Sequence, residues 1–326
     1  MSRVRHAKSI IAACIAAWAL VACGWQDPVA DNGTGGGSGN GSGNGNGGTG
    51  FSGQDSSAPL LTNNIAADGR AWINYRRTQV GMPALTQNIT IDRAAQGHSD
   101  YQRINDVVTH DQTRGRQGFT GITLEDRLRA AGYSFGDPNR IGEVIAATPN
   151  QTGFYMAEEL ITAIYHRFVI FEPVFQEIGS GSAIGSSRAY FTANFVTNNG
   201  FGPGLPAGTL ATWPMNGQTG VTPNFRSDSE EPDPVPDLDM VGYPISVHTN
   251  LTRTLTVRSF TVRARNGNAD LPIRLLVRGQ DAETTSTSVA AIIPLSPLNA
   301  NTVYDVSFSG AIDGTAISKT WSFTTK

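Results

Sequence analysis

The side chains best suited to chemistry in this sequence of 326 residues are its five histidines and two cysteines. Neutral imidazoles and a carboxylate can together hold zinc and leave one position open for water. Covalent catalysis instead needs a nucleophile beside a base, with a third group that orients the base. The cysteines, Cys14 and Cys23, fall at the extreme N-terminus. Histidine chemistry is therefore the first kind of site to consider, and no nucleophile with both partners is recognisable.

His166 stands near the start of a long apolar run, IYHRFVIFEPVFQEIGSG at residues 164–181. An imidazole among so much hydrocarbon is typical of a buried histidine that keeps one hydrogen bond. His110 and Glu143 are the other candidates, but the three residues are separated by 33 and 23 positions, unlike the tight spacings of zinc fingers and zincins. Spacing by itself therefore does not predict a metal site.

Two further histidines are expected to be structural. His98 shares a helix face with Ala94, Ala95 and Tyr101, which predicts a packed side chain. His248 lies in the alternating pattern YPISVHTN, which favours an edge or surface position on a strand.

The elements that would position these residues follow from the hydrophobic pattern of residues 60–200. Apolar residues at helical spacing predict helices within 63–81, 88–109, 123–132 and 156–171. Thr90 and Thr123 are expected to cap the second and third of these helices. Strands are predicted over 140–148, 177–185 and 189–196. Helices on both faces of a short sheet would give an α-β-α sandwich.

Residues 240–326 lose the helical period and alternate apolar with polar residues instead. Short segments rich in Val, Ile, Thr and Phe are separated by turn signals such as RNGNAD and IDGT. This pattern predicts a small antiparallel sandwich. Its closing stretch, from PLNANTVYDVSFSG to KTWSFTT, resembles the immunoglobulin-like domains of bacterial surface proteins. That resemblance implies a spacer or adhesion module. The predicted fold class of the whole chain is α+β, with an α-β-α sandwich followed by an all-β immunoglobulin-like sandwich.

The N-terminus has the features of an export signal. Basic residues precede a short apolar run, which closes with LVAC at Leu20–Cys23 and resembles a bacterial lipobox. The resemblance implies lipidation at Cys23, a membrane partner and a place in the cell envelope, with the outer membrane of a Gram-negative bacterium as the expected destination. The predicted units are a signal peptide at 1–22, a Gly/Ser/Asn tether at 23–59, a first domain at 60–200, a Pro/Gly-rich linker at 201–239 and a second domain at 240–326.

The charge balance excludes a nucleic-acid partner. The formal net charge is −3, and cleavage before Cys23 would remove three basic residues and shift it to −6. Nucleic-acid binding relies on a basic face that neutralises phosphates. The mature chain would also contain no disulfide, so its stability must come from the size of its core.

Several motifs of the first domain occur in the order seen in the CAP superfamily. They are NYRRTQVGMPAL, RAAQGHSDY, the TH that ends at residue 110, DRLRAAGY, IGEVIA, the HR at residue 166 and FEPVFQEIGSG. This superfamily groups cysteine-rich secretory proteins, antigen-5 venom allergens, plant pathogenesis-related proteins and many bacterial exported proteins. The chain resembles the bacterial branch, which lacks the eukaryotic disulfides, and the resemblance implies the α-β-α sandwich.

The CAP resemblance also implies a cleft formed by two histidines and two acidic residues that can hold a divalent metal such as zinc. Carried onto this sequence, the histidines are His110 and His166, and the acid of the GEN motif is Glu143. The second acid of the family has no counterpart here, because its position falls near Ala163. Glu125 is a candidate to replace it. Two departures, Val144 for asparagine and Leu160 for tryptophan, would loosen the surroundings of such a site.

Three functions follow as expectations. The first is an anchored binding module for a lipid, glycan or protein ligand, with a weak metal site or a purely structural polar cluster in the cleft. The second is a metal-dependent hydrolase or protease that uses His110, Glu143 and His166. The third is a structural surface adhesin.

Overall fold

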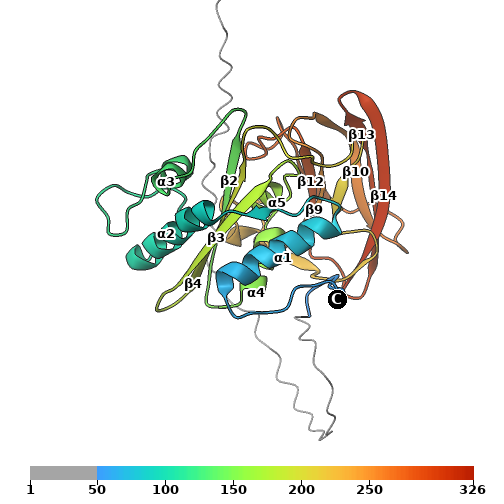
Figure 1. Ribbon diagram of the computed structural model, residues 1–326. Coiled ribbons are helices and arrows are strands. Elements are labelled where there is room, and N and C mark those ends of the chain that lie inside the picture. The colour runs from blue at the N-terminus through green and yellow to red at the C-terminus, as the bar shows by residue number, and fades with distance from the viewer. Residues whose placement is uncertain (1–49) are drawn as a thin grey trace, which may run out of the picture.

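The computed structural model describes residues 50–326 (Figure 1). The predicted signal peptide at 1–22, Cys23 and the tether as far as residue 49 lie outside the described residues. Within residues 50–326, no helix combines the length and the apolar character needed to cross a membrane.

Helices cover both faces of a four-stranded sheet in the first half of the described chain (Figure 1). The helices are α1 (Ile65–Gln79), α2 (Ile89–Asn105), α3 (Leu124–Ala130), α4 (Gly153–Thr162) and α5 (Ile164–Ile170). The strands are β1 (Thr86–Gln87), β2 (Arg140–Thr148), β3 (Glu177–Ile184) and β4 (Ala189–Thr197), in the order β1-β3-β4-β2. The expected layers of helix, sheet and helix are therefore present in this half of the molecule.

Side-chain alternation along the strands separates the two faces of this sheet. On β2, a Cβ on Gly142 would lie 2.7 Å from Val169 of α5, so this face packs against α1, α4 and α5. The next residue, Glu143, points to the opposite face, where it meets residues of α2 and α3. Because successive strand residues face opposite ways, α5 and the Glu143 carboxylate belong to different layers.

The predicted N-terminal cap is confirmed in one helix and wrong in another. Thr123 forms the expected capping box with Asp126 at the start of α3. At α2 the cap is Asn88, whose side chain accepts a hydrogen bond from the backbone N–H of Thr90, so the prediction that Thr90 is the cap was wrong.

The single helix predicted over 156–171 is instead two helices. Ala163 takes an extended conformation, with φ −65° and ψ 123°, and separates α4 from α5. The carboxylate of Glu230 accepts hydrogen bonds from the backbone N–H groups of Ile164 and Tyr165, both at 2.7 Å. A residue far along the chain thus caps α5, which local sequence could not reveal.

Two further four-stranded sheets form the second half of the molecule. One has the order β10-β13-β14-β6 and the other β11-β12-β9-β5. A short pair, β7 and β8, completes the strands. Their bounds are β5 (Ala211–Trp213), β6 (Gln218–Val221), β7 (Asn224–Arg226), β8 (Met240–Gly242), β9 (Ile245–His248), β10 (Leu255–Ala264), β11 (Ile273–Leu276), β12 (Val289–Pro294), β13 (Val303–Ile312) and β14 (Thr315–Thr325). This region is rich in strands as expected, and its likeness to immunoglobulin-like domains stays a prediction.

Residues 201–239 differ from the extended linker expected from their Pro and Gly content. They contain β5, β6, β7 and a 3-10 turn at Ser227–Ser229. β5 pairs with β9, and β6 runs parallel to β14. The segment is therefore part of the C-terminal sheets, because its few apolar side chains, such as Trp213 and Val221, are buried among theirs.

One continuous core joins the two halves of the molecule. The rings of Phe171, at the end of α5, and Trp213 of β5 lie 5.5 Å apart within this core. The N-terminal segment also bridges the halves, because Gly53 donates to Thr219 of β6 while the guanidinium of Arg76 in α1 donates to Ser52. The tether was expected to reach residue 59, but residues 51–55 are bonded to the body. A separate spacer domain does not fit this shared core.

A buried carboxyl group at this junction should make stability depend on pH. Glu172, which follows α5, accepts hydrogen bonds from the backbone of Val174 and, across the junction, of Leu251. Burial raises the pKa of Glu172 to about 7, despite these bonds and nearby Arg77. A raised pKa favours the protonated form in the folded state. The contribution of Glu172 to the free energy of unfolding is therefore complete below the unfolded-state pKa near 4.5. This contribution is lost as the pH rises through about 7.

Glu172→Gln should therefore be more stable than the wild type at pH 8 and similar to it near pH 4.5. The expected difference at pH 8 is about 3 kcal/mol in the free energy of unfolding. Urea unfolding of residues 50–326 at both pH values measures it. Glu125→Gln, at an exposed position, is the control and should change neither value. If the free energy of unfolding changed equally with pH in the wild type and in Glu172→Gln, the raised pKa would not belong to Glu172.

Candidate functional site

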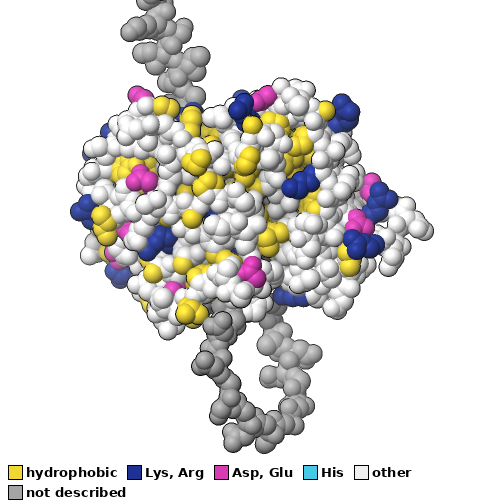
Figure 2. Space-filling view, turned by 45° about the vertical axis from the view of Figure 1, so that its right-hand side comes forward, with side chains coloured by type: hydrophobic (Ala, Val, Ile, Leu, Met, Phe, Trp, Pro, Cys, Tyr) yellow, Lys and Arg dark blue, Asp and Glu magenta, His cyan; other side chains and the backbone are white. Residues whose placement is uncertain are grey.

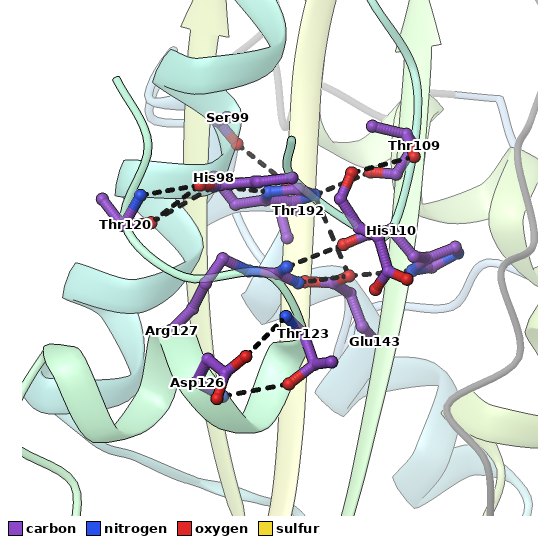
Figure 3. Close-up of polar contacts among 12 residues, drawn as sticks. His98, Ser99, Thr109, His110, Thr120, Thr123, Asp126, Arg127, Glu143 and Thr192 are labelled. Atoms are coloured by element: carbon purple, nitrogen blue, oxygen red, sulfur yellow. Dashed lines mark hydrogen bonds and ion pairs between the residues drawn. The ribbon is translucent and has the colours of Figure 1, made fainter. Parts of the chain in front are cut away.

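Glu143 lies at the centre of a buried polar cluster between the sheet and helices α2 and α3 (Figure 3). Arg127 of α3 donates from Nη2 to both carboxylate oxygens of Glu143, at 2.8 Å each. The other terminal nitrogen of Arg127 donates to the carbonyls of His110, at 2.7 Å, and Ile122, at 3.0 Å. Arg127 therefore neutralises Glu143 and ties the loop before α3 to the sheet.

Two histidines complete this cluster. His110 Nδ1 lies 2.8 Å from Glu143 Oε1, and His98 Nε2 lies 3.9 Å from the same oxygen. His98 is held on both sides, since Nε2 lies 2.8 Å from the Thr109 carbonyl and Nδ1 lies 3.0 Å from Gln112 Nε2. We call these five residues, His98, His110, Gln112, Arg127 and Glu143, the polar cluster. It links α2, the following loop, α3 and β2.

His166 does not belong to the polar cluster, although the sequence analysis placed it there. It lies at the start of α5, on the other face of the sheet, with Nδ1 at 3.1 Å from Glu230 Oε1. His166 and Glu230 are both buried at the junction between the halves. The physical reason is the pleat of β2, which sends Glu143 away from α5. The structure thus brings together His110 and Glu143 but not His166.

The acids considered for the fourth position lie elsewhere. Glu125 is exposed and pairs with Arg129 one turn along α3. Glu158 of α4 accepts hydrogen bonds from Trp72 Nε1 at 2.7 Å and from Arg76 at 2.9 Å. Arg127 and His98 were not predicted as members of the cluster. The signal that could have found His98 is the group of polar residues on the buried face of α2, namely His98, Ser99 and Gln102.

His248 also differs from its expected surface position. It is fully buried on β9, a central strand, and Ser246 lies 2.9 Å from its Nε2. The rings of Phe168 and Phe171 from α5 pack against it. Burial first, and then the charge of Arg167, lowers the pKa of His248 to about 3, so it is neutral.

The electrostatics of the polar cluster fix its protonation. Burial raises the pKa of Glu143, but Arg127 and the histidines outweigh that effect and hold the pKa well below its usual range. Burial lowers the pKa of His98 to about 4. Glu143 is thus an ionised carboxylate and His98 a neutral imidazole across the physiological range, so Glu143 is a poor proton acceptor.

The donor set of this cluster does not suit a divalent metal. Both oxygens of Glu143 are held by the Arg127 guanidinium, and a cation would have to displace that charge. Both nitrogens of His98 are engaged as well. Across residues 50–326, no group of three or more His, Cys, Asp or Glu side chains is arranged to hold a metal ion. We therefore derive no chemistry through a metal here.

One stretch of the sequence fits the GxSxG pattern of serine hydrolases. Gly132-Tyr133-Ser134-Phe135-Gly136 lies in the loop between α3 and β2, and the Ser134 carbonyl accepts a hydrogen bond from Asn198. A nucleophile elbow requires a strand before the serine and a helix after it. Here the helix comes first and the strand second, so the pattern does not mark a nucleophile.

Comparisons with known proteins agree with this fold. Residues 71–197 match the family model described as CAP, the cysteine-rich secretory protein family. No curated protein sequence matches the chain. Similar solved structures include an extracellular protein with an SCP domain from Bacillus anthracis, at 24% identity and a TM-score of 0.35, over 44% of this chain and 45% of that one. This chain thus spans less than half of that protein's length.

Two other similar structures come from Borrelia burgdorferi and Schistosoma mansoni. An outer surface protein of Borrelia burgdorferi matches 40% of this chain and 90% of its own, with 16% identity and a TM-score of 0.33. Venom allergen-like protein 4 of Schistosoma mansoni matches 45% of this chain and 96% of its own, with 13% identity and a TM-score of 0.30. The family match shows that residues 71–197 are similar to the CAP family.

Proposed function

We propose that this protein is a non-catalytic binding module of the CAP type, held outside the cytoplasm by a lipid on Cys23. The observation that carries the proposal is the pairing of Glu143 with Arg127, which occupies both carboxylate oxygens. With its oxygens held and its pKa lowered, Glu143 lacks the properties of a general base. The polar cluster then serves to brace α2, α3 and the loop between them against the sheet.

The N-terminal motif and the names of similar structures support the proposed location. LVAC at the end of the apolar run supports lipidation, and the names of two similar structures describe an extracellular protein and an outer surface protein. On the face seen in Figure 2, charged side chains are scattered among uncharged ones. Such a surface favours a ligand recognised by hydrogen bonds and apolar contact, which leaves lipids, glycans and proteins as candidate classes.

A metal titration separates the binding module from the metal-dependent hydrolase. Residues 50–326 are titrated with zinc by calorimetry and assayed against peptidoglycan and casein, as the wild type, His110→Ala and Glu143→Gln. We expect no saturable zinc binding and no hydrolysis above the buffer rate in any of the three. The matched control is His248→Ala, because His248 is also a buried histidine but lies on β9, outside the polar cluster. Zinc binding at one equivalent that His110→Ala abolishes and His248→Ala retains would overturn the proposal.

The binding activity itself needs a direct test. The same protein is offered three immobilised probes, namely phosphatidylglycerol and phosphatidylethanolamine vesicles, N-acetylglucosamine oligomers, and unfolded casein. Saturable retention on one class supports the proposal. Failure to bind any of the three at protein concentrations up to the millimolar range, where weak extracellular modules still bind, contradicts it.

A further inference from the structure

A groove of about 630 Å³ opens at one end of the CAP domain, away from the polar cluster. Three parts of the chain meet there: the segment that leads into α1, the segment that leads into α4, and the end of β3. Its lining is Leu61, Asn63, Asn64, Ile65, Asp68, Gln151, Thr152, Ser182, Ala183 and Ile184. A cavity of this size is within the range that holds small ligands in proteins.

The polar side chains of this groove are not used by the fold. Within the described part of the chain, no hydrogen bond engages the side-chain amides of Asn63 and Gln151 or the hydroxyls of Thr152 and Ser182. Asn64 and Asp68, in contrast, do have structural roles, since Asn64 Oδ1 caps α1 and Asp68 Oδ1 holds Thr62. Amides and hydroxyls both donate and accept hydrogen bonds, and so do the hydroxyl groups of a sugar.

Asp68 gives the floor of the groove an unsatisfied acceptor. Its side chain is buried, with 1% exposed, and Oδ1 accepts hydrogen bonds from the backbone and hydroxyl of Thr62. Oδ2 has no hydrogen-bond partner among residues 50–326. A buried acceptor without a partner is costly, and because Oδ2 is itself shielded from solvent, a ligand hydroxyl would satisfy it only after a small shift of the surrounding side chains.

Charge and shape narrow the ligand class. Among the described residues, one acid and no basic residue line the groove, so phosphate, sulfate and carboxylate groups are disfavoured as ligands. Leu61 and Ile184 on its rim are 41% and 55% exposed. Aliphatic side chains of this kind fit the C–H faces of sugar rings, while the amides and hydroxyls meet the ring's hydroxyl groups.

A peptide would most simply add a strand to the free edge of β3, but that edge is blocked. β1 pairs only with the first two residues of β3. Beyond them, Asp92 of α2 accepts from the Ser180 N–H, and Gln96 both accepts from the Ser182 N–H and donates to its carbonyl. These side chains occupy the groups that a peptide backbone would need.

We propose that this groove binds a neutral, hydroxyl-rich glycan. The proposal rests on the binding function argued above and names its ligand class and site. Asn63 and Gln151 supply paired donors and acceptors from two segments of the lining, Asp68 supplies a buried carboxylate, and Leu61 and Ile184 supply the apolar contact.

The test uses N,N′,N″-triacetylchitotriose as the probe and residues 50–326 as the protein. Calorimetry gives the affinity, and the side-chain amide NMR signals of Asn63 and Gln151 report contact directly. The double variant Asn63→Gly, Gln151→Ala should bind about tenfold more weakly, because two hydrogen-bonding amides are lost. Glycine suits position 63, where φ is 64°. The control is Gln117→Ala, an exposed glutamine outside the groove, which should bind as the wild type does.

Each outcome decides between the two proposals. Binding with amide shifts at Asn63 and Gln151, weakened in the double variant, supports the groove. Binding that the double variant leaves unchanged overturns the site. If the vesicles or casein bind while the trisaccharide does not, the glycan inference fails and the binding function stands. If none of the probes binds, both proposals fail.

Discussion

Arg127→Met should lower the free energy of unfolding by about 3–5 kcal/mol. The guanidinium is buried and forms two hydrogen bonds to the buried Glu143 carboxylate and two to backbone carbonyls. Its removal leaves a buried negative charge without its main partner and frees the carbonyls of His110 and Ile122. Methionine nearly preserves the volume, so the loss reports electrostatics and hydrogen bonding rather than a cavity. Urea unfolding of residues 50–326 at pH 7 measures the change.

A matched pair of variants separates this effect from a general loss of charge on α3. Arg129 lies on the same helix, and its ion pair with Glu125 is about half exposed on both sides, so Arg129→Met should change stability by less than about 0.5 kcal/mol. In the Arg127→Met background, Glu143→Gln should restore part of the lost stability, because the orphaned charge disappears. Equal effects at positions 127 and 129, or no rescue by Glu143→Gln, would show that the buried pair is not what braces α3.

The helix and sheet layers of residues 65–197 could be predicted because their signals are local. Helical spacing, the Thr123 cap and the strand segments at 140–148, 177–185 and 189–196 each depend on neighbours in sequence, and all three were found in the structure. The break at Ala163 could not be predicted in this way, since the cap of α5 comes from Glu230. The strands within 201–239 could not be predicted either. The Pro and Gly content of this segment favours a linker, and the strands that pair with it lie in the last third of the chain.

The candidate site was predicted only in part, and the reason is geometrical. His110 and Glu143 were correctly placed together, at 2.8 Å. His166 was placed with them through the family resemblance, but the pleat of β2 and the cap on α5 put it with Glu230. Arg127 was unrecognisable as a partner because an arginine on an amphipathic helix usually faces solvent. Burial of that arginine is a property of the assembled layers, which no single segment encodes.

Deletion of residues 201–326 should prevent residues 50–200 from folding, although the sequence predicts a separate domain at 60–200. In the whole molecule, Ile164 and Tyr165 pack in one cluster with side chains of β7, β8, β11 and β12. Arg167 donates to the Pro244 carbonyl at 2.8 Å, and Glu230 caps α5. The deletion exposes the apolar groups, at about 1.5–3 kcal/mol each, and removes the two acceptors of Arg167 Nη1, the Pro244 carbonyl and the Ser246 hydroxyl. These losses together approach the whole stability of an ordinary domain, about 5–15 kcal/mol.

The measurement compares three proteins by near-UV circular dichroism and urea unfolding. Residues 50–326 should unfold in one cooperative transition, while residues 50–200 should show neither a near-UV signal nor a cooperative transition. The control is the full chain with a protease site between Ala207 and Gly208, in an exposed loop. After cleavage it should stay associated and keep the signal, because the chain is cut but the contacts remain. A cooperative transition in residues 50–200 alone would instead show that the shared core is dispensable, and that α5 can be capped and covered without Glu230 and the C-terminal sheets.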